Sequence, residues 1–71
     1  MTLQELEHLL YLKNEILGDF RIDITSQYKY KEVYISFSAV NKGFSERGSD
    51  ISKVLEDIYK KIEDFLIKID D

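Results

Sequence analysis

The strongest constraint on the fold is the spacing of large apolar residues in the last third of the chain. These residues recur at intervals of four, three, four, three and four positions, which matches one face of an α-helix. Gly48 interrupts the preceding segment, and Ser49 or Asp50 can cap a helix that starts there. The pattern predicts a helix over residues 50–69 with one apolar seam, formed by Ile51, Leu55, Ile58, Ile62, Phe65 and Ile69.

The beginning of the chain predicts a second helix, over residues 3–17. Thr2 and Glu5 fit a capping box, in which each side chain accepts a hydrogen bond from the other residue's backbone N–H. Gly18 follows the last apolar residue and can take the left-handed conformation that ends a helix. Between these signals, leucines and an isoleucine recur at helical spacing.

The middle of the chain changes to a period of two. Apolar and polar residues alternate over residues 20–28 and again over 33–40, which is the pattern of half-buried strands. The polar connection at residues 29–32 predicts an antiparallel hairpin between them. Asn41 and Gly43 indicate a turn, with Gly43 suited to positive φ, and leave open a short third strand around residues 44–46.

These elements predict an α+β fold: a two-layer sandwich, α-β-β-(β)-α, with two helices packed on one face of a small antiparallel sheet. The whole chain, residues 1–71, is expected to form a single domain. A chain this short buries only about 60% of its unfolded surface. It contains no cysteine, so disulfides cannot add stability.

Charge and composition limit the function classes. The net charge is −4, and a mildly basic middle, residues 20–48, lies between two acidic ends. This distribution does not favour non-specific DNA binding, which needs a concentrated basic surface. The sequence shows neither a signal-peptide pattern nor an apolar run of the roughly 20 residues that span a bilayer. We therefore expect a cytoplasmic protein without a membrane partner.

Catalysis is not expected, and we assign no catalytic, cofactor or metal residues. His8 is the only histidine, and it lacks a partner with which to act as a general base. Paired carboxylates such as Asp57 and Asp64 stand four residues before Lys61 and Lys68. Pairs at that spacing are typical of a solvated helix face rather than of a metal site.

One segment suggests a small ligand. Glycines, hydroxyls and two basic residues precede the start of the predicted C-terminal helix, where free N–H groups can bind a phosphate or nucleotide. Glu46 and Asp50 bring negative charge to the same place, so an ordinary helix start is the alternative. The candidate anion-binding loop comprises Lys42, Ser45, Arg47, Gly48 and Ser49.

The hairpin offers a second candidate surface, around Tyr30 and Tyr34. Tyrosines beside lysines can stack on bases, and tyrosine is equally common at protein interfaces. With a third strand, the element order resembles the topology of the double-stranded-RNA-binding domain, which implies binding of RNA. The sequence departs from that family where its second helix should begin with a basic cluster, because residues 49–53 read Ser-Asp-Ile-Ser-Lys.

The end of the C-terminal helix is a third candidate surface, because the helix is expected to extend beyond the sheet. Phe65, Leu66 and Ile69 would then need a covering partner, such as a second copy in a homodimer. In composition, the chain resembles small accessory proteins of AT-rich bacterial genomes and their phages, some of which inhibit host defence proteins. Protein–protein binding is therefore the first functional hypothesis, a nucleotide or other small ligand the second, and nucleic acid the third.

Overall fold

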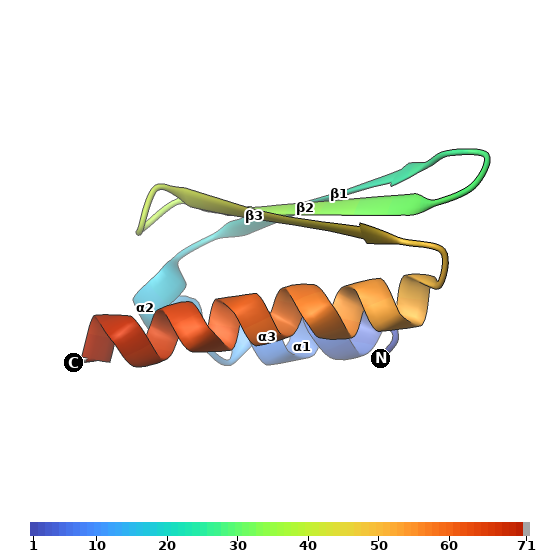
Figure 1. Cartoon of the computed structure of the whole chain (residues 1–71). Coiled ribbons are helices and arrows are strands. Elements are labelled where there is room, and N and C mark those ends of the chain that lie inside the picture. Colours follow the sequence, from blue (N-terminus) through green and yellow to red (C-terminus); the bar gives the residue numbers. More distant parts are fainter. Residues whose placement is uncertain (71) are drawn as a thin grey trace.

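The protein has two layers, a three-stranded sheet and a layer of helices, in the order α-β-β-β-α (Figure 1). The computed structural model describes residues 1–70. Both long helices lie on the same face of the sheet, so the predicted class and arrangement are confirmed (Figure 1). The helices are α1 (Leu3–Tyr11), α2 (Asn14–Leu17) and α3 (Ile51–Asp70). Within residues 1–70, no helix is long and apolar enough to cross a membrane.

The sheet is antiparallel, with the strand order β1-β2-β3. Its strands are β1 (Phe20–Ser26), β2 (Lys31–Phe37) and β3 (Lys42–Gly48). The third strand is therefore as long as the other two, instead of the short segment around residues 44–46. The predicted strand over 20–28 stops two residues early, and the predicted strand over 33–40 is shifted towards the N-terminus. These shifts arise because the four residues between β1 and β2, and again those between β2 and β3, form the turns.

The turn before β3 takes its positive φ at Asn41, which has φ 48°, and Gly43 lies inside the strand. The assignment of positive φ to Gly43 was therefore wrong. Asparagine tolerates the left-handed region better than most residues, which explains why the turn closes at this position.

The predicted helix over residues 3–17 is broken at Leu12 and Lys13, and α2 turns away from α1 to rise toward the sheet (Figure 1). The break was not predicted. Asn14 accepts the Gly18 backbone N–H at its carbonyl oxygen over 2.8 Å, and its side-chain amide donates to the Gly18 carbonyl over 3.1 Å. This closed turn lets the chain leave the helix layer and enter β1 with only two residues between Leu17 and Phe20. The capping box of Thr2 and Glu5 is present as predicted.

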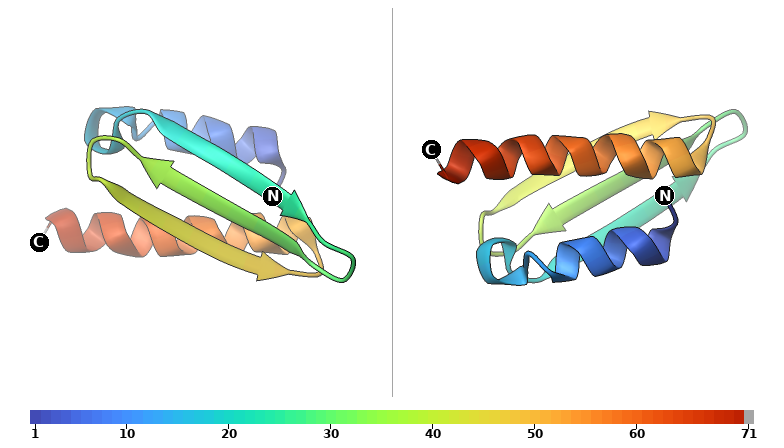
Figure 2. Two further views of the ribbon diagram at one scale, coloured as in Figure 1. Left: turned by 90° about the horizontal axis from the view of Figure 1, so that it is seen from above. Right: turned by 90° about the horizontal axis from the view of Figure 1, so that it is seen from below.

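The core lies between the sheet and the helices and consists of aliphatic residues and two phenylalanines. The seam of α3 provides much of it, and three successive inward-facing residues of β2 complete the opposite side. The strands cross α3 diagonally (Figure 2), so the sheet covers the helix over a large part of its length. The buried core residues are Leu6, Leu10, Leu17, Val33, Ile35, Phe37, Phe44, Val54, Leu55, Ile58, Ile62 and Leu66.

Candidate protein-interaction surface

The face of the sheet opposite the helices is left uncovered by other elements (Figure 1). Because side chains alternate along a strand, the register places every second residue of each strand on this outer face. Three cross-strand rows result: Arg21, Ser36 and Gly43; Asp23, Tyr34 and Ser45; Thr25, Glu32 and Arg47.

Tyr34 occupies the centre of this outer face, on the middle strand. Its ring lies across Gly43 of the neighbouring strand, so closely that a Cβ at Gly43 would overlap the tyrosine hydroxyl. An aromatic ring over a strand glycine shields backbone that the glycine would otherwise leave bare. Tyr34 is thereby held in one place while 44% of it stays exposed.

Arg47 and Tyr30 form a second fixed contact on the outer face. The guanidinium carbon of Arg47 lies 5.5 Å from the centroid of the Tyr30 ring, a cation–π arrangement. Tyr30 directly precedes β2 and stands at alternate positions with Glu32 and Tyr34, so its side chain lies on the same outer face. The contact therefore joins the β1–β2 hairpin to β3.

The tip of the β1–β2 hairpin extends beyond the helix layer (Figure 2). The Gln27 backbone N–H donates to the Tyr30 carbonyl over 2.8 Å and closes the tip. Tyr28 lies there, 97% exposed. The predicted tyrosine surface therefore runs from the centre of the sheet to the end of the hairpin.

The structure does not bring the predicted anion-binding residues together. Lys42 to Gly48 form β3, not a loop, and only Ser49 lies in the connection to α3. Lys42 and Arg47 therefore point to opposite faces of the sheet, since they are five residues apart on one strand. Ser45 faces outward with Arg47, whereas the backbone of Gly48 lies against α3.

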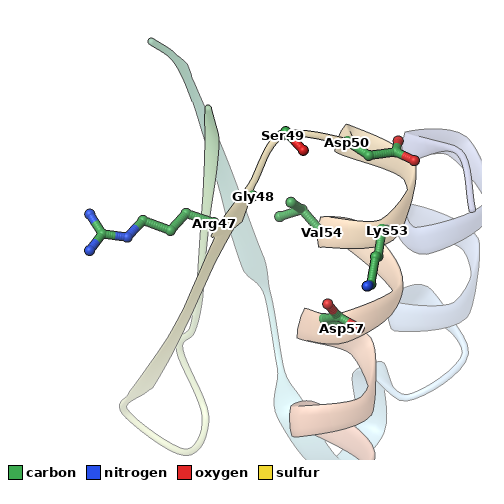
Figure 3. A pocket seen from close by; sticks show the side chains of 7 residues that line it. All are labelled: Arg47, Gly48, Ser49, Asp50, Lys53, Val54 and Asp57. Atoms are coloured by element: carbon green, nitrogen blue, oxygen red, sulfur yellow. The ribbon is translucent and has the colours of Figure 1, made fainter. Parts of the chain in front are cut away.

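A hollow of about 210 Å³ does lie at the start of α3 (Figure 3). The Arg47 side chain extends away from it, and Asp50 and Asp57 line it together with Lys53. The Asp50 carboxylate accepts the Ser52 backbone N–H over 3.0 Å, so an acidic side chain already satisfies part of the helix N-terminus. These contacts form an ordinary helix start.

The helix-end candidates are divided between core and surface. Phe65 packs edge-on against Phe44 with ring centroids 5.5 Å apart, and the Lys42 ammonium lies 4.8 Å from the centroid of Phe65. Leu66 is only 8% exposed, so it belongs to the core and not to a free surface. Ile69 is 44% exposed.

The junction of β3 and α3 contains a contact that the sequence did not indicate. Lys61 forms an ion pair of 3.0 Å with Glu46 and also donates a hydrogen bond of 3.0 Å to the Ser45 carbonyl. The Lys61 hydrogen bond lowers the pKa of Glu46, against an opposing effect of partial burial. The predicted pairing of Lys61 with Asp57 on the helix surface is replaced by this contact with β3.

Among residues 1–70, no group of three or more histidine, cysteine, aspartate or glutamate side chains is arranged to hold a metal ion. His8 lies exposed on α1. The chain matches no model of a known protein family, no curated protein sequence and no solved structure in our comparisons. The function must therefore be argued from the geometry of the outer face.

Proposed function

We propose that this protein is a non-enzymatic interaction protein that binds another protein through the outer face of its sheet. The observation that carries the proposal is the pair of fixed contacts on this face, Tyr34 across Gly43 and Arg47 on Tyr30. Tyrosine and arginine contribute more than other residues to the binding energy of protein interfaces. Side chains that are already ordered lose less conformational entropy when a partner binds.

The charge of the outer face supports a protein partner over a nucleic acid. Arg21 and Arg47 are balanced by Asp23 and Glu32 on the same face. A phosphate backbone would be repelled by the two carboxylates as much as it would be attracted by the two guanidinium groups. Mixed charge around a central aromatic residue is common at protein interfaces. A phage-encoded inhibitor of a host defence protein would act in this way, by occupying a surface of its target.

The test compares three alanine substitutions in affinity capture from a lysate of the natural host, with bound proteins quantified by mass spectrometry. Tyr34→Ala and Arg47→Ala should each weaken capture of the partner by about tenfold or more, as truncation of a central interface residue does. Tyr11→Ala is the matched control, because Tyr11 is 70% exposed on α1, on the opposite side of the molecule. It should leave capture unchanged.

Native mass spectrometry of the gently purified protein separates the alternatives. A retained protein that is lost on Tyr34→Ala supports the proposal. A retained nucleic acid, with binding that weakens steeply as salt rises, would contradict it. A small added mass whose retention depends on Lys42 and Arg47 would contradict it as well, and would favour a ligand-binding function.

A further inference from the structure

The first strand forms a free edge of the sheet, because β1 has β2 as its only neighbour. Two backbone hydrogen bonds flank the β1–β2 ladder, from the Gln27 N–H to the Tyr30 carbonyl and from the Ser38 N–H to the Asp19 carbonyl. Bonded pairs alternate in an antiparallel ladder, so the odd-numbered residues of β1 bond to β2. The even-numbered residues therefore direct their backbone N–H and C=O groups to the free edge: Phe20, Ile22, Ile24 and Ser26.

The other edge of the sheet is protected. At β3, Lys61 donates a hydrogen bond to the Ser45 carbonyl and pairs with Glu46, and α3 packs along the strand. Lysine side chains and covering helices are common protections of a sheet edge. At β1, by contrast, Ile24 belongs to the apolar side of the strand and is still 43% exposed. The β1 edge is therefore the one that can accept a further strand.

The helix layer extends beyond the β1 edge. In both views of Figure 2, the N-terminal half of α1 reaches past β1, so it lies in the layer beneath the space that an additional strand would fill. The first turn of α1 includes Leu3, which is 37% exposed. A strand beside β1 would thus find free backbone groups at the level of the sheet and apolar surface at the level of the helices.

This overhang of α1 limits what can pair with β1. A second copy that paired its own β1 about a two-fold axis would place its helices in the same layer, and the two α1 helices would collide. An extended segment without such a helix layer meets no such obstacle. Addition of a strand to a sheet edge is a common mode of peptide recognition, in which main-chain hydrogen bonds give affinity and alternate side chains give specificity.

We propose that the β1 edge binds an extended segment of the partner protein as a fourth, antiparallel strand. The inference deepens the proposed function and rests on it, since it names the part of the partner that is bound. Antiparallel pairing is slightly more stable per residue than parallel pairing. In this arrangement, Ile22 and Ile24 each exchange two backbone hydrogen bonds with the residue opposite.

The side chains of β1 define the chemistry of the bound segment. The apolar residues Phe20, Ile22 and Ile24 require apolar residues opposite them. On the outer face, the side chains of Arg21 and Asp23 are 78% and 48% exposed. Opposite charges that face each other stabilise a strand pair, and like charges destabilise it. The segment therefore alternates apolar and polar residues, with a basic residue opposite Asp23 and, two positions later, an acidic residue opposite Arg21.

A synthetic, capped peptide with this pattern, Thr-Val-Lys-Val-Glu-Val-Thr, is the probe for an NMR titration of the full chain. At saturation, the peptide should slow hydrogen exchange of the Ile22 and Ile24 amides at least tenfold. The Arg21 and Asp23 amides should exchange slowly even without peptide, because they bond to β2. Equal protection of all four amides in the free protein, or no binding of the peptide at millimolar concentration, would overturn the inference.

Backbone methylation of the peptide tests the strand pairing itself. In the proposed register, the valine N–H groups face β1, whereas those of the lysine and the glutamate point away. N-methylation of the central valine should weaken binding about tenfold or more. N-methylation of the adjacent lysine is the matched control and should weaken binding much less. Equal losses would exclude an antiparallel strand in this register.

Substitutions in the protein locate the bound peptide. Ile24→Lys introduces a charge on the apolar side of the edge and should weaken peptide binding at least tenfold. Ile67→Lys is the matched control, since Ile67 is 61% exposed on α3, and it should bind the peptide as the wild type does. Circular dichroism establishes that both variants are folded. Loss of binding in Ile67→Lys alone would place the peptide at the helix end and overturn the inference.

Reversal of the two edge charges tests the register. The wild type should bind the original peptide about fivefold more tightly than the peptide in which lysine and glutamate are exchanged. The double variant Arg21→Glu and Asp23→Lys keeps the net charge and should reverse this preference. The same preference in both proteins would contradict the proposed charge pairs.

Partner capture separates this inference from the proposed function. If Tyr34→Ala abolishes capture and Ile24→Lys does not, the outer face binds the partner without the edge, and only the present inference fails. If the peptide binds at β1 but Tyr34→Ala and Arg47→Ala leave capture unchanged, only the function proposed for the outer face fails. Loss of capture in both Tyr34→Ala and Ile24→Lys, with Ile67→Lys unaffected, is the result expected.

Discussion

Gly18 combines a positive φ of 74° with a close approach to the turn after β2. A Cβ there would lie 2.8 Å from the Ala39 Cβ and 2.9 Å from the Ala39 backbone nitrogen. Its φ and ψ belong to a region that essentially only glycine occupies. Gly18→Ala should therefore lower the free energy of unfolding by about 1–3 kcal/mol in urea denaturation.

Gly48→Ala is the control for that substitution. At Gly48 a new Cβ would meet only the end of the Val54 side chain, at 3.1 Å. We expect it to cost less than about 1 kcal/mol, because glycine is also entropically unfavourable within a strand. Equal losses in the two variants would contradict the role assigned to Gly18.

The ion pair of Glu46 and Lys61 predicts a pH dependence of stability. Because the Lys61 hydrogen bond lowers the pKa of Glu46 below its ordinary value of 4.5, the unfolded chain binds the proton more readily. The stabilisation is present above pH 4.5 and is lost as the pH falls through the lower pKa of the folded state. Both side chains are partly exposed, so the contribution should stay below about 1 kcal/mol.

Carboxyl titration by NMR measures this effect directly. In Lys61→Ala the pKa of Glu46 should move back up, and the variant should lose less stability than the wild type on acidification. Lys60→Ala is the matched control, since Lys60 is an exposed lysine one position away on α3. An unchanged Glu46 titration in Lys61→Ala would exclude the proposed cause.

At the scale of elements, the seam of α3 holds the two layers together. Ile58 is fully buried in it, whereas Ile67, on the same helix, is 61% exposed. Ile58→Ala should reduce the free energy of unfolding by about 2–5 kcal/mol, since it removes buried methyl groups and leaves a cavity. Ile67→Ala should change it by no more than about 0.5 kcal/mol. Thermal or urea unfolding of the pair checks both values.

The element periods predicted the class of fold, because each pattern is set by burial against one surface. The break at Leu12 and Lys13 could not be predicted in this way. Both flanking segments keep apolar residues at helical spacing, and neither a glycine nor a proline marks the break. The break is required by the tertiary structure, because the chain must pass from the helix layer to the sheet before Phe20.

The sequence pattern did not predict the full length of β3, for a related reason. Lys42 and Glu46 occupy inward-facing positions, where the alternation rule expects apolar residues. Lys42 instead lies over the Phe65 ring, and Glu46 pairs with Lys61. Contacts with residues far away in the sequence thus stabilise charged side chains at these inward-facing positions. A local pattern of apolar and polar residues cannot predict such contacts.

At the scale of the molecule, the sequence placed Tyr34 on the outer face correctly, because alternation within one strand decides it. The sequence could not place Arg47 on the outer face. The direction in which its side chain points depends on β3 extending to Gly48. The burial of Leu66 and the partial burial of Phe65 were not predicted, because the diagonal crossing of strands and helix (Figure 2) carries the sheet farther along α3 than strand length alone suggests.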